Sequence, residues 1–252
     1  MNPVKAVLFD FDGTISTLRH GWEKIMEPLM VELLGEESRP QIQTYIDEST
    51  GIQTIFQMKW LAQQVQQRHG TAQDPWEYKA EYNRRLMEMV QKRREALADG
   101  SASRQDFMIA GSDDLLEMLH NMGAKLYVAS GTDDPDVKAE VEALGLTKYF
   151  DKIAGAPLGK ESCSKEKVIR DLLSAGIPGK EMAVVGDGKV EIMVGRESGA
   201  RTLGLASNEE ARQGIDPVKR QRLIKAGADI ILGDFLDKER LVRFFIGAGV
   251  EI

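Results

Sequence analysis

The sequence predicts an α/β protein: a Rossmann-like parallel sheet with helices on both faces, interrupted by an inserted all-helical domain. Residues 4–9 form a nearly continuous apolar run, typical of a strand that is covered on both faces. From about residue 107 onwards, short apolar strands alternate with helices, which indicates a parallel sheet. Residues 18–99 differ, because their apolar positions follow helical spacing with few β-branched runs.

Composition narrows the class of protein. The chain has 252 residues, and its 40 acidic and 33 basic side chains give a net charge of −7. This balance argues against nucleic acid or an anionic membrane as the main partner. The single cysteine, Cys163, is interpreted as an unreactive thiol and fits a reducing cytoplasm. Without a signal-peptide pattern or a run long enough to span a membrane, we expect a cytoplasmic monomer or homodimer.

The inserted segment is expected to hold four helices. The clearest start is Asp74-Pro75-Trp76-Glu77, where an Asp N-cap precedes Pro at the first helical position and Glu at the third. The expected helices cover residues 20–34, 40–46 (capped by Ser38), 52–68 and 74–98, followed by a linker at 99–103. We therefore predict a core domain of residues 1–16 and 105–252, and a helical cap domain of residues 17–104.

The second part of the chain is expected to complete the sheet. Strands are predicted at residues 125–130, 152–155, 182–186, 202–206 and 229–232. Helices are predicted at residues 113–122 (capped by Ser112), 136–144, 165–175 (capped by Ser164), 190–198, 217–225 and 238–245. Right-handed crossovers bring the carboxyl ends of such strands to one edge, so residues that follow strands should meet there.

Three of the predicted strands end in polar side chains that could take part in catalysis or bind a ligand. The first strand runs into Asp10-Phe11-Asp12-Gly13-Thr14, which places two acids side by side. Paired acids repel each other unless a metal or a division of roles justifies them, although an Asp-Gly turn after a strand is the simpler alternative. The second strand ends in Ser130-Gly131-Thr132, and a later one in Gly186-Asp187, with Glu191 on the first turn of the next helix. A strand-end turn and a solvated first-turn acid are the corresponding alternatives.

These segments, in this order, resemble the motifs of the haloacid dehalogenase-like (HAD) hydrolase superfamily. The resemblance implies that Asp10 is the nucleophile and Asp12 the general acid/base of the phosphatase and phosphomutase branch. It also implies that Ser130 binds a phosphoryl oxygen, with the amides of Gly131 and Thr132 as further donors.

The same resemblance implies a magnesium site and a phosphate-binding lysine. Mg²⁺ would be held by Asp10, Asp187 and the backbone carbonyl of Asp12, with Glu191 binding it directly or through water. The family more often has Asp where this chain has Glu191. Three lysines could fill the third motif: Lys165 opens a helix after Ser164, Lys160 is the second candidate, and Lys167 is interpreted as a solvated side chain.

The position and helical character of the inserted segment resemble a cap of the C1 class. Thr50-Gly51-Ile52-Gln53-Thr54 resembles the specificity loop of such caps, which implies that Gly51, Gln53 and Thr54 contact substrate. Further candidates are Arg19, His20 and Trp22, although Trp22 also fits the helical core. The loop lacks the arginine that some sugar-phosphate mutases use there, and Lys24 or Lys59 are the possible replacements.

We therefore expect a Mg²⁺-dependent phosphatase that hydrolyses a small phosphorylated metabolite through an aspartyl-phosphate. One alternative is a phosphomutase of the β-phosphoglucomutase type, which would need a second phosphate clamp in the cap. The other is a non-catalytic HAD-like binding protein, which would not need the repelling pair Asp10 and Asp12. Dehalogenase and phosphonatase activities are disfavoured, because those branches of the family lack the second aspartate.

Overall fold

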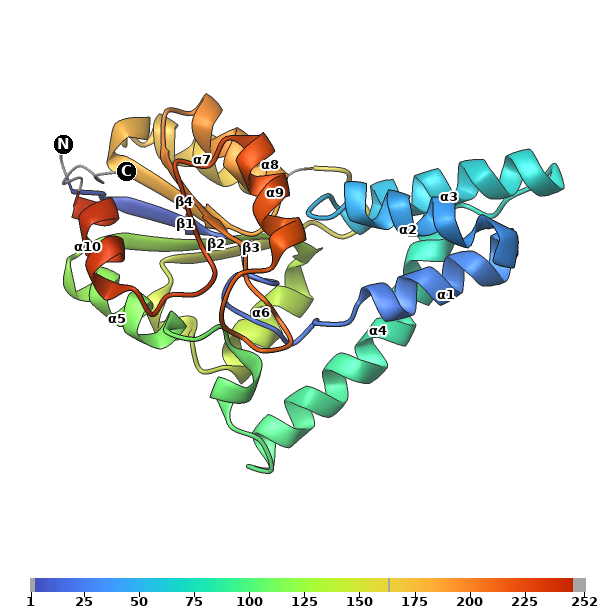
Figure 1. Ribbon diagram of the computed structural model, residues 1–252, viewed down its shortest axis with the longest axis horizontal. Coiled ribbons are helices and arrows are strands. Elements are labelled where there is room, and N and C mark those ends of the chain that lie inside the picture. The colour runs from blue at the N-terminus through green and yellow to red at the C-terminus, as the bar shows by residue number, and fades with distance from the viewer. Residues whose placement is uncertain (1–2, 163, 247–252) are drawn as a thin grey trace.

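The computed structural model describes residues 3–162 and 164–246 and contains one six-stranded parallel sheet, as predicted (Figure 1). The strand order is β3-β2-β1-β4-β5-β6, and each neighbouring pair is parallel. The strands are β1 (Ala6–Phe9), β2 (Lys125–Asp133), β3 (Lys152–Ala156), β4 (Met182–Gly186), β5 (Arg201–Leu205) and β6 (Ile230–Leu232). The first strand lies at the centre of the sheet, so the residues that follow it are flanked by the ends of β2 and β4.

Helices cover both faces of the sheet. One face packs on α5 (Ser112–Asn121), α6 (Asp134–Ala143) and α10 (Lys238–Ile246), which share a buried cluster with Phe9 and Val128. The opposite face packs on α7 (Ser164–Ser174), α8 (Lys189–Glu197) and α9 (Pro217–Ala226). Alternate residues of β1 point to the two faces, so every side chain of this strand is buried.

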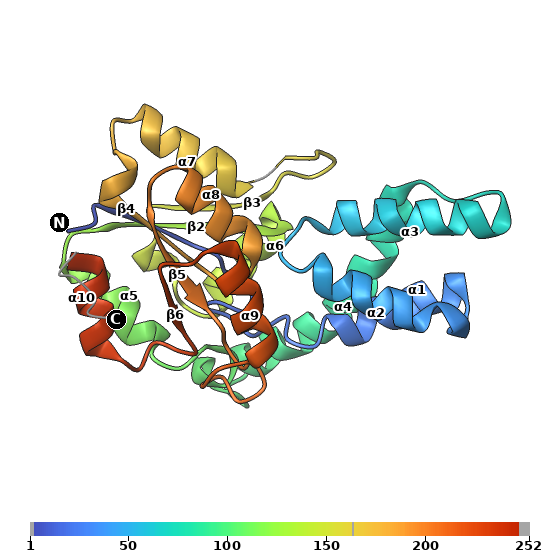
Figure 2. The ribbon, with the colours of Figure 1, turned by 45° about the horizontal axis from the view of Figure 1, so that its top comes forward.

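Four helices form a separate helical block at the carboxyl edge of the sheet (Figures 1 and 2). They are α1 (Glu23–Leu34), α2 (Arg39–Glu48), α3 (Thr54–His69) and α4 (Pro75–Ala98). The block has its own hydrophobic core, in which Met26, Met58 and Val90 are fully buried. Asp74 caps α4 by accepting a hydrogen bond from the Trp76 amide at 2.8 Å, as expected. The domain boundaries at residues 17 and 104 stay a prediction.

Several element ends differ from the predicted ones. The first helix begins at Glu23 rather than residue 20, because residues 17–20 form an irregular linker to the block. The predicted caps Ser112 and Ser164 are instead the first helical residues of α5 and α7. Ser38 precedes α2, but its hydroxyl donates to the Leu34 carbonyl and makes no capping bond. Cys163 lies outside the described residues.

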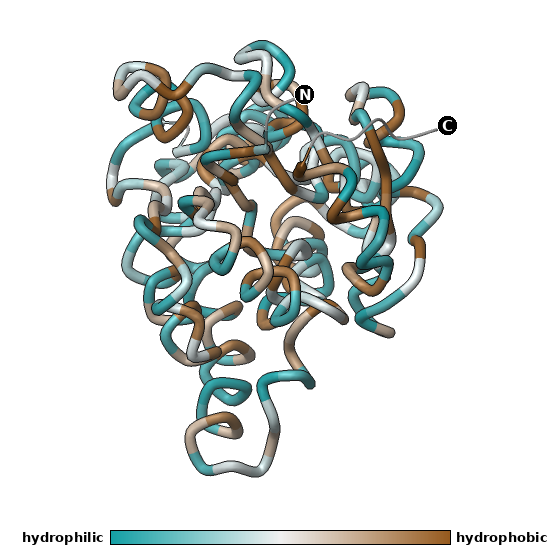
Figure 3. Tube along the Cα trace, turned by 90° about the vertical axis from the view of Figure 1, so that its left-hand side faces the viewer, coloured by the Kyte–Doolittle hydropathy of each residue, from teal (hydrophilic) through white to brown (hydrophobic). Residues whose placement is uncertain are grey.

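Hydrophobic and hydrophilic residues alternate along the helices in Figure 3, as expected for helices that bury one side. Even α4, with 24 residues, carries many charged side chains. In the part of the chain that the structure describes, no helix is both long and apolar enough to cross a membrane.

Candidate active site

The carboxyl ends of β1, β2 and β4 bring Asp10, Ser130 and Asp187 to one place, as the motif order predicts. The Asp10 amide donates to the Val185 carbonyl at 2.8 Å, which continues the pairing of β1 with β4 beyond the strand. The chain then turns sharply at Gly13, whose φ of +71° favours glycine. A Cβ atom at this position would lie 2.3 Å from Asp187 Oδ2, so the turn can pass over Asp187 only with glycine.

Lys165 lies directly beside Asp10. Its Nζ is 3.0 Å from Asp10 Oδ2 and 2.7 Å from Glu191 Oε2, and all three side chains are buried. The Ser164 hydroxyl fixes the start of α7 by donating to the Ser130 carbonyl at 2.6 Å. The position of Lys165 supports its assignment over the two other candidate lysines.

Those two lysines are placed differently. Lys160 is exposed in the loop after β3, and the exposed Lys167 pairs with Asp171 at 2.9 Å on the surface of α7. Neither Lys160 nor Lys167 is among the residues that line the cavity at this edge of the sheet.

A second lysine, Lys219, which sequence reasoning missed, occupies the other side of the site, and its side chain is only 13% exposed. Lys219 Nζ lies 2.7 Å from Asp187 Oδ2 and 2.6 Å from Glu209 Oε1. Glu209 also faces His20, whose Nδ1 is 3.7 Å away. The available signal was positional: Lys219 lies in the first turn of α9, behind the Asp216 cap, just as Lys165 lies in the first turn of α7.

The charges at the site do not balance. Four carboxylates share the two lysines: those of Asp10, Asp187 and Glu191, which are buried, and that of Glu209, which is 13% exposed. One ligand oxygen from each of Asp10, Asp187 and Glu191 lies within 4.8 Å of the others. Buried excess negative charge is unfavourable without a cation, and oxygen-only ligands are what a hard divalent cation requires. The residues present therefore fit a divalent metal ion.

The pKa shifts reflect the same imbalance. Burial raises the pKa of Asp10 well above its usual value against the charge of Lys165, and neighbouring carboxylates add to the rise. Burial likewise raises the pKa of Asp187, although Lys219 opposes it. Burial also opposes ionisation of Glu191, but Lys165 and hydrogen bonds from the backbone outweigh it and lower the pKa of that carboxyl. Its neighbours therefore favour the ionised form of Glu191, whereas the positive charge near Asp10 does not offset the burial of that carboxylate.

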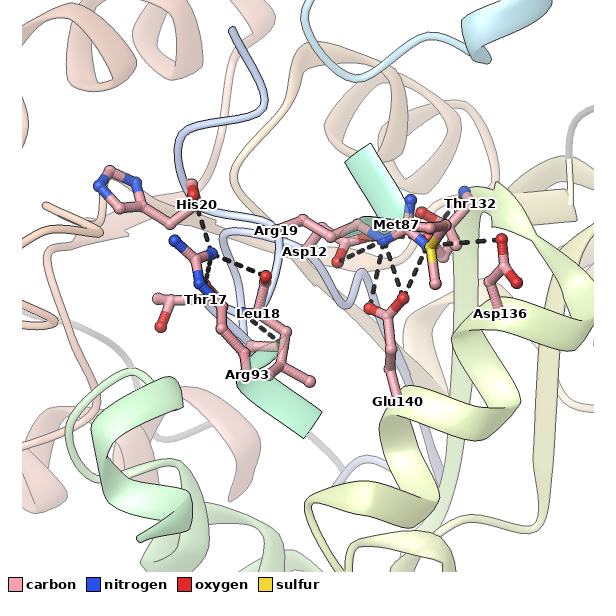
Figure 4. A network of polar contacts seen from close by, with 12 residues as sticks. Asp12, Thr17, Leu18, Arg19, His20, Met87, Arg93, Thr132, Asp136 and Glu140 are labelled. Atoms are coloured by element: carbon pink, nitrogen blue, oxygen red, sulfur yellow. Dashed lines mark hydrogen bonds and ion pairs between the residues drawn. The ribbon is translucent and has the colours of Figure 1, made fainter. Parts of the chain in front are cut away.

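Asp12 is held from two sides (Figure 4). Its Oδ2 accepts hydrogen bonds from the hydroxyls of Thr132 at 2.8 Å and Ser130 at 3.3 Å. Its Oδ1 faces Arg19, whose Nε is 3.9 Å away. The Thr132 side chain thus contacts Asp12, a role that the sequence did not suggest.

A cavity of about 400 Å³ separates the core from the helical block. From the core it is lined by all the predicted residues except Glu191, which is buried and accepts a hydrogen bond from Lys165: Asp10, Asp12, Ser130, Gly131, Thr132, Lys165 and Asp187. From the predicted loop, Gly51 and Thr54 line it, whereas the Gln53 amide donates to the Ser162 carbonyl. The loop thus lies at the site, but its glutamine fixes the block to the loop before α7.

Of the other candidate residues in the inserted segment, some line the cavity and some do not. Arg19 and Trp22 line the cavity, and Trp22 also packs on the core of the helical block. Lys24 is exposed, and Lys59 pairs with Glu161 at 2.6 Å, so the cavity lining includes neither. The charged residues that line the cavity from α1 and α2 are all acidic: Glu23, Glu27 and Asp47.

The fold and the site define an α/β protein with a cluster of buried carboxylates at the carboxyl edge of its parallel sheet. The chain belongs to the haloacid dehalogenase-like hydrolases, because the model of that family matches residues 4–199. A protein from Clostridium perfringens that is named for a pyrophosphatase activity, PpaX, is 24% identical over 216 residues, covering 80% of this chain and 84% of the relative.

Solved structures share the fold. A protein from Haemophilus somnus 129PT, described as a predicted phosphoglycolate phosphatase, matches with a TM-score of 0.65 and 16% identity, over 96% of this chain and 99% of that one. The β-phosphoglucomutase of Clostridium difficile matches with a TM-score of 0.67 and 14% identity, over 96% and 97% of the two chains. CbbY of Rhodobacter sphaeroides, solved with phosphate, matches with a TM-score of 0.62 and 20% identity, over 93% and 96%.

Proposed function

We propose that the protein is a Mg²⁺-dependent phosphatase that hydrolyses a small phosphorylated metabolite through an aspartyl-phosphate on Asp10. The observation that carries the proposal is the position of Asp10, a buried carboxylate that lines the cavity with Lys165 at 3.0 Å and Asp12 two residues away. A carboxylate nucleophile needs a cationic neighbour when it attacks a phosphate dianion, and a separate acid for the leaving group.

The metal would be held by Asp10, Asp187 and the Asp12 carbonyl, with Glu191 as a direct or water-mediated ligand. The buried carboxylate cluster and its excess negative charge support this assignment. When bound, a divalent cation offsets the charge of the phosphate and of the attacking carboxylate. The cytoplasmic location expected from the sequence is consistent with a small metabolite as the substrate.

The side chains of this protein supply the remaining steps. An Asp10 oxygen forms a bond to phosphorus while the bond to the leaving oxygen breaks, and Asp12 gives that oxygen a proton. A water molecule then attacks the phosphorus of the aspartyl-phosphate and passes a proton to Asp12, which restores Asp10 and releases phosphate. Ser130 and Lys165, with the amide of Gly131, hold the transferring oxygens. The Thr132 amide, the other donor implied by the sequence, instead donates to Ser130 Oγ at 3.0 Å.

Hydrolysis is favoured over transfer to a phosphosugar. A phosphomutase must hold a second phosphate on the cap side of the cavity, and the charged residues that α1 and α2 contribute there are acidic. Two arginines also line the cavity, but Glu140 binds the Arg19 guanidinium at 2.6 Å, and Arg222 Nη1 lies 3.6 Å from Asp47 on α2. A purely binding protein is disfavoured, since ligand binding alone gives no reason to bury uncompensated carboxylates.

A panel of phosphorylated metabolites, assayed for phosphate release with and without Mg²⁺, tests this function. We expect one class of phosphate monoester to be hydrolysed only when Mg²⁺ is present. Asp10→Asn should fold normally and release no phosphate, because an amide is a poor nucleophile. Normal turnover by this variant, or no hydrolysis of any compound by the parent, would refute the proposal.

A further inference from the structure

Arg19 is an arginine whose charge is buried next to Asp12. Its side chain is only 10% exposed, and the carboxylate of Glu140 on α6, which is fully buried, accepts hydrogen bonds from the Nε and Nη2 atoms of Arg19. Nη2 donates to Glu140 Oε1 at 2.6 Å, and Nε donates to the two oxygens of the same carboxylate at 3.0 and 3.2 Å. This two-pronged contact fixes the plane of the guanidinium.

The backbone around Arg19 is fixed by a second arginine. Arg93 of α4 donates from Nη1 to the carbonyls of Thr17, Leu18 and His20, at 3.3, 2.7 and 2.9 Å (Figure 4). The linker that carries Arg19 is thus held by the helical block through Arg93 and by the core through Glu140. Within the described part of the chain, Arg93 makes no hydrogen bond or ion pair with Asp12. Arg93 therefore supports the backbone of the linker, whereas Arg19 contacts the Asp12 side chain.

The two oxygens of Asp12 have different surroundings. Oδ2 receives the hydroxyl hydrogen bonds, whereas Oδ1 is buried and has no hydrogen-bond partner among the described residues. The Arg19 Nε lies 3.9 Å from Oδ1, close enough for charge attraction but too far for a hydrogen bond. An unpaired buried carboxylate oxygen is unfavourable, and here the nearby guanidinium compensates its charge.

We infer that Arg19, oriented by Glu140, is a positioning residue that aligns the Asp12 carboxylate at the cavity, where Asp12 exchanges a proton with the leaving oxygen. This inference rests on the proposed function. Glu140 keeps the guanidinium from closing on Oδ1, and the charge of Arg19 keeps Asp12 aligned while Thr132 and Ser130 hold Oδ2. Removing Arg19 should therefore impair proton transfer to the leaving group more than attack on phosphorus.

Two substrates separate these steps. Glycerol phosphate has a poor leaving group that requires a proton, whereas p-nitrophenyl phosphate has a good one that does not. kcat/KM reports the steps up to departure of the leaving group, so it excludes later hydrolysis of the aspartyl-phosphate. For Arg19→Ala we expect kcat/KM to fall about 10²-fold for glycerol phosphate and only a few-fold for p-nitrophenyl phosphate, with Arg19→Lys in between.

Two further variants keep the test decisive. Arg19→Ala leaves Glu140 buried without its partner, so the double variant Arg19→Met/Glu140→Leu removes both charges and preserves the packing; it should show the same selective loss. Arg93→Ala weakens the same linker without touching Asp12, and should affect the two substrates equally. Equal losses for both substrates in the folded double variant would overturn the inference. A parent protein that hydrolyses neither compound, nor any member of the panel, would overturn the proposed function and the inference with it.

Discussion

The core side of the cavity and the side formed by the helical block are built from different chemistry. On the core side, Lys165 and Lys219 lie within 3.0 Å of carboxylates that follow strands of the sheet. On the other side, the lining is a mixture of apolar and uncharged polar residues with three acids: Trp22, Gln43, Ile46, Thr50, Gly51, Ile52, Thr54, Gln57, Tyr82 and Leu86, with Glu23, Glu27 and Asp47.

The difference implies a division of roles. Strand ends in a packed parallel sheet hold charged groups precisely, which catalysis by electrostatic stabilisation requires. The helical block has its own core and meets the sheet domain largely through polar contacts, so we expect it to open and close over the site while its lining selects among leaving groups. Changes on the core side should therefore affect all substrates alike, and changes on the other side should affect some more than others.

The largest effect is expected from the lysine beside Asp10. Lys165→Ala removes the cation that faces the attacking carboxylate, so kcat should fall by about 10²–10³-fold for every substrate in the panel. Lys160→Ala is the matched control, because Lys160 is exposed in the preceding loop. An inactive Lys160 variant beside a nearly normal Lys165 variant would show that the third motif is misassigned.

The buried Glu140 on the core side should also make the stability of the folded protein depend on pH. Burial raises the pKa of Glu140 from 4.5 to about 7 against the pull of Arg19, so the folded state holds a proton that the unfolded chain releases. The resulting stability is present below pH 4.5 and is lost as the pH rises through about 7.

Glu140→Gln removes this titration. The free energy of unfolding of the parent, relative to the variant, should fall by up to about 3 kcal/mol between the two ends of that pH window. Urea unfolding of both proteins at several pH values measures the difference. A difference that does not change with pH would mean that Glu140 is ionised throughout.

Substitutions at the contacts that join the helical block to the core should have effects of intermediate size on KM. Lys79 and Asn83 of α4 both bind the carboxylate of Asp133 at the end of β2, and the Lys79 and Asp133 side chains are only 10% and 8% exposed. Lys79→Met leaves Asp133 without its charge partner and should favour an open block, raising KM about tenfold with a smaller change in kcat.

Lys59 provides the control for that variant. It also joins the block to the core, but its pair with Glu161 is 44% and 39% exposed, and such surface pairs contribute little. Lys59→Met should therefore change KM less than twofold, by the small energy of an exposed pair. Equal effects of the two substitutions would contradict a role for the buried contact in closure.

The smallest effect is expected at the loop of residues 50–54. Thr54→Ala and Gln53→Ala should change relative kcat/KM across the panel by about five- to tenfold, the energy of one hydrogen bond, and leave the Mg²⁺ requirement unchanged. Thr54 would act through the cavity, and Gln53 through the Ser162 carbonyl. Unaltered substrate profiles would exclude this loop and leave Trp22 and Arg19 as the specificity candidates.

The same contrast explains what could be predicted from the sequence. Asp10, Ser130 and Asp187 were predictable, because parallel strands must bring their ends to one edge. For Lys219 the sequence offered only its place in the first turn of a helix, and for its partner Glu209 it offered nothing, since Glu209 lies in an irregular loop whose path no periodic pattern specifies. The Arg19–Glu140 contact joins residues 121 positions apart, and depends on how α6 packs beside the linker. Gln53 was placed at the right loop, but its hydrogen-bond partner depends on how the block docks.

The central claim is that Asp10 becomes covalently phosphorylated during turnover. The most direct test is to mix the parent with its best substrate and Mg²⁺, quench in acid within one turnover, and locate the phosphoryl group by peptide mass spectrometry. Asp10→Asn, treated identically, is the control. We predict one phosphoryl group on Asp10 in the parent and none in the variant. Phosphate release without any phosphorylated Asp10, or with the group on another residue, would contradict the account.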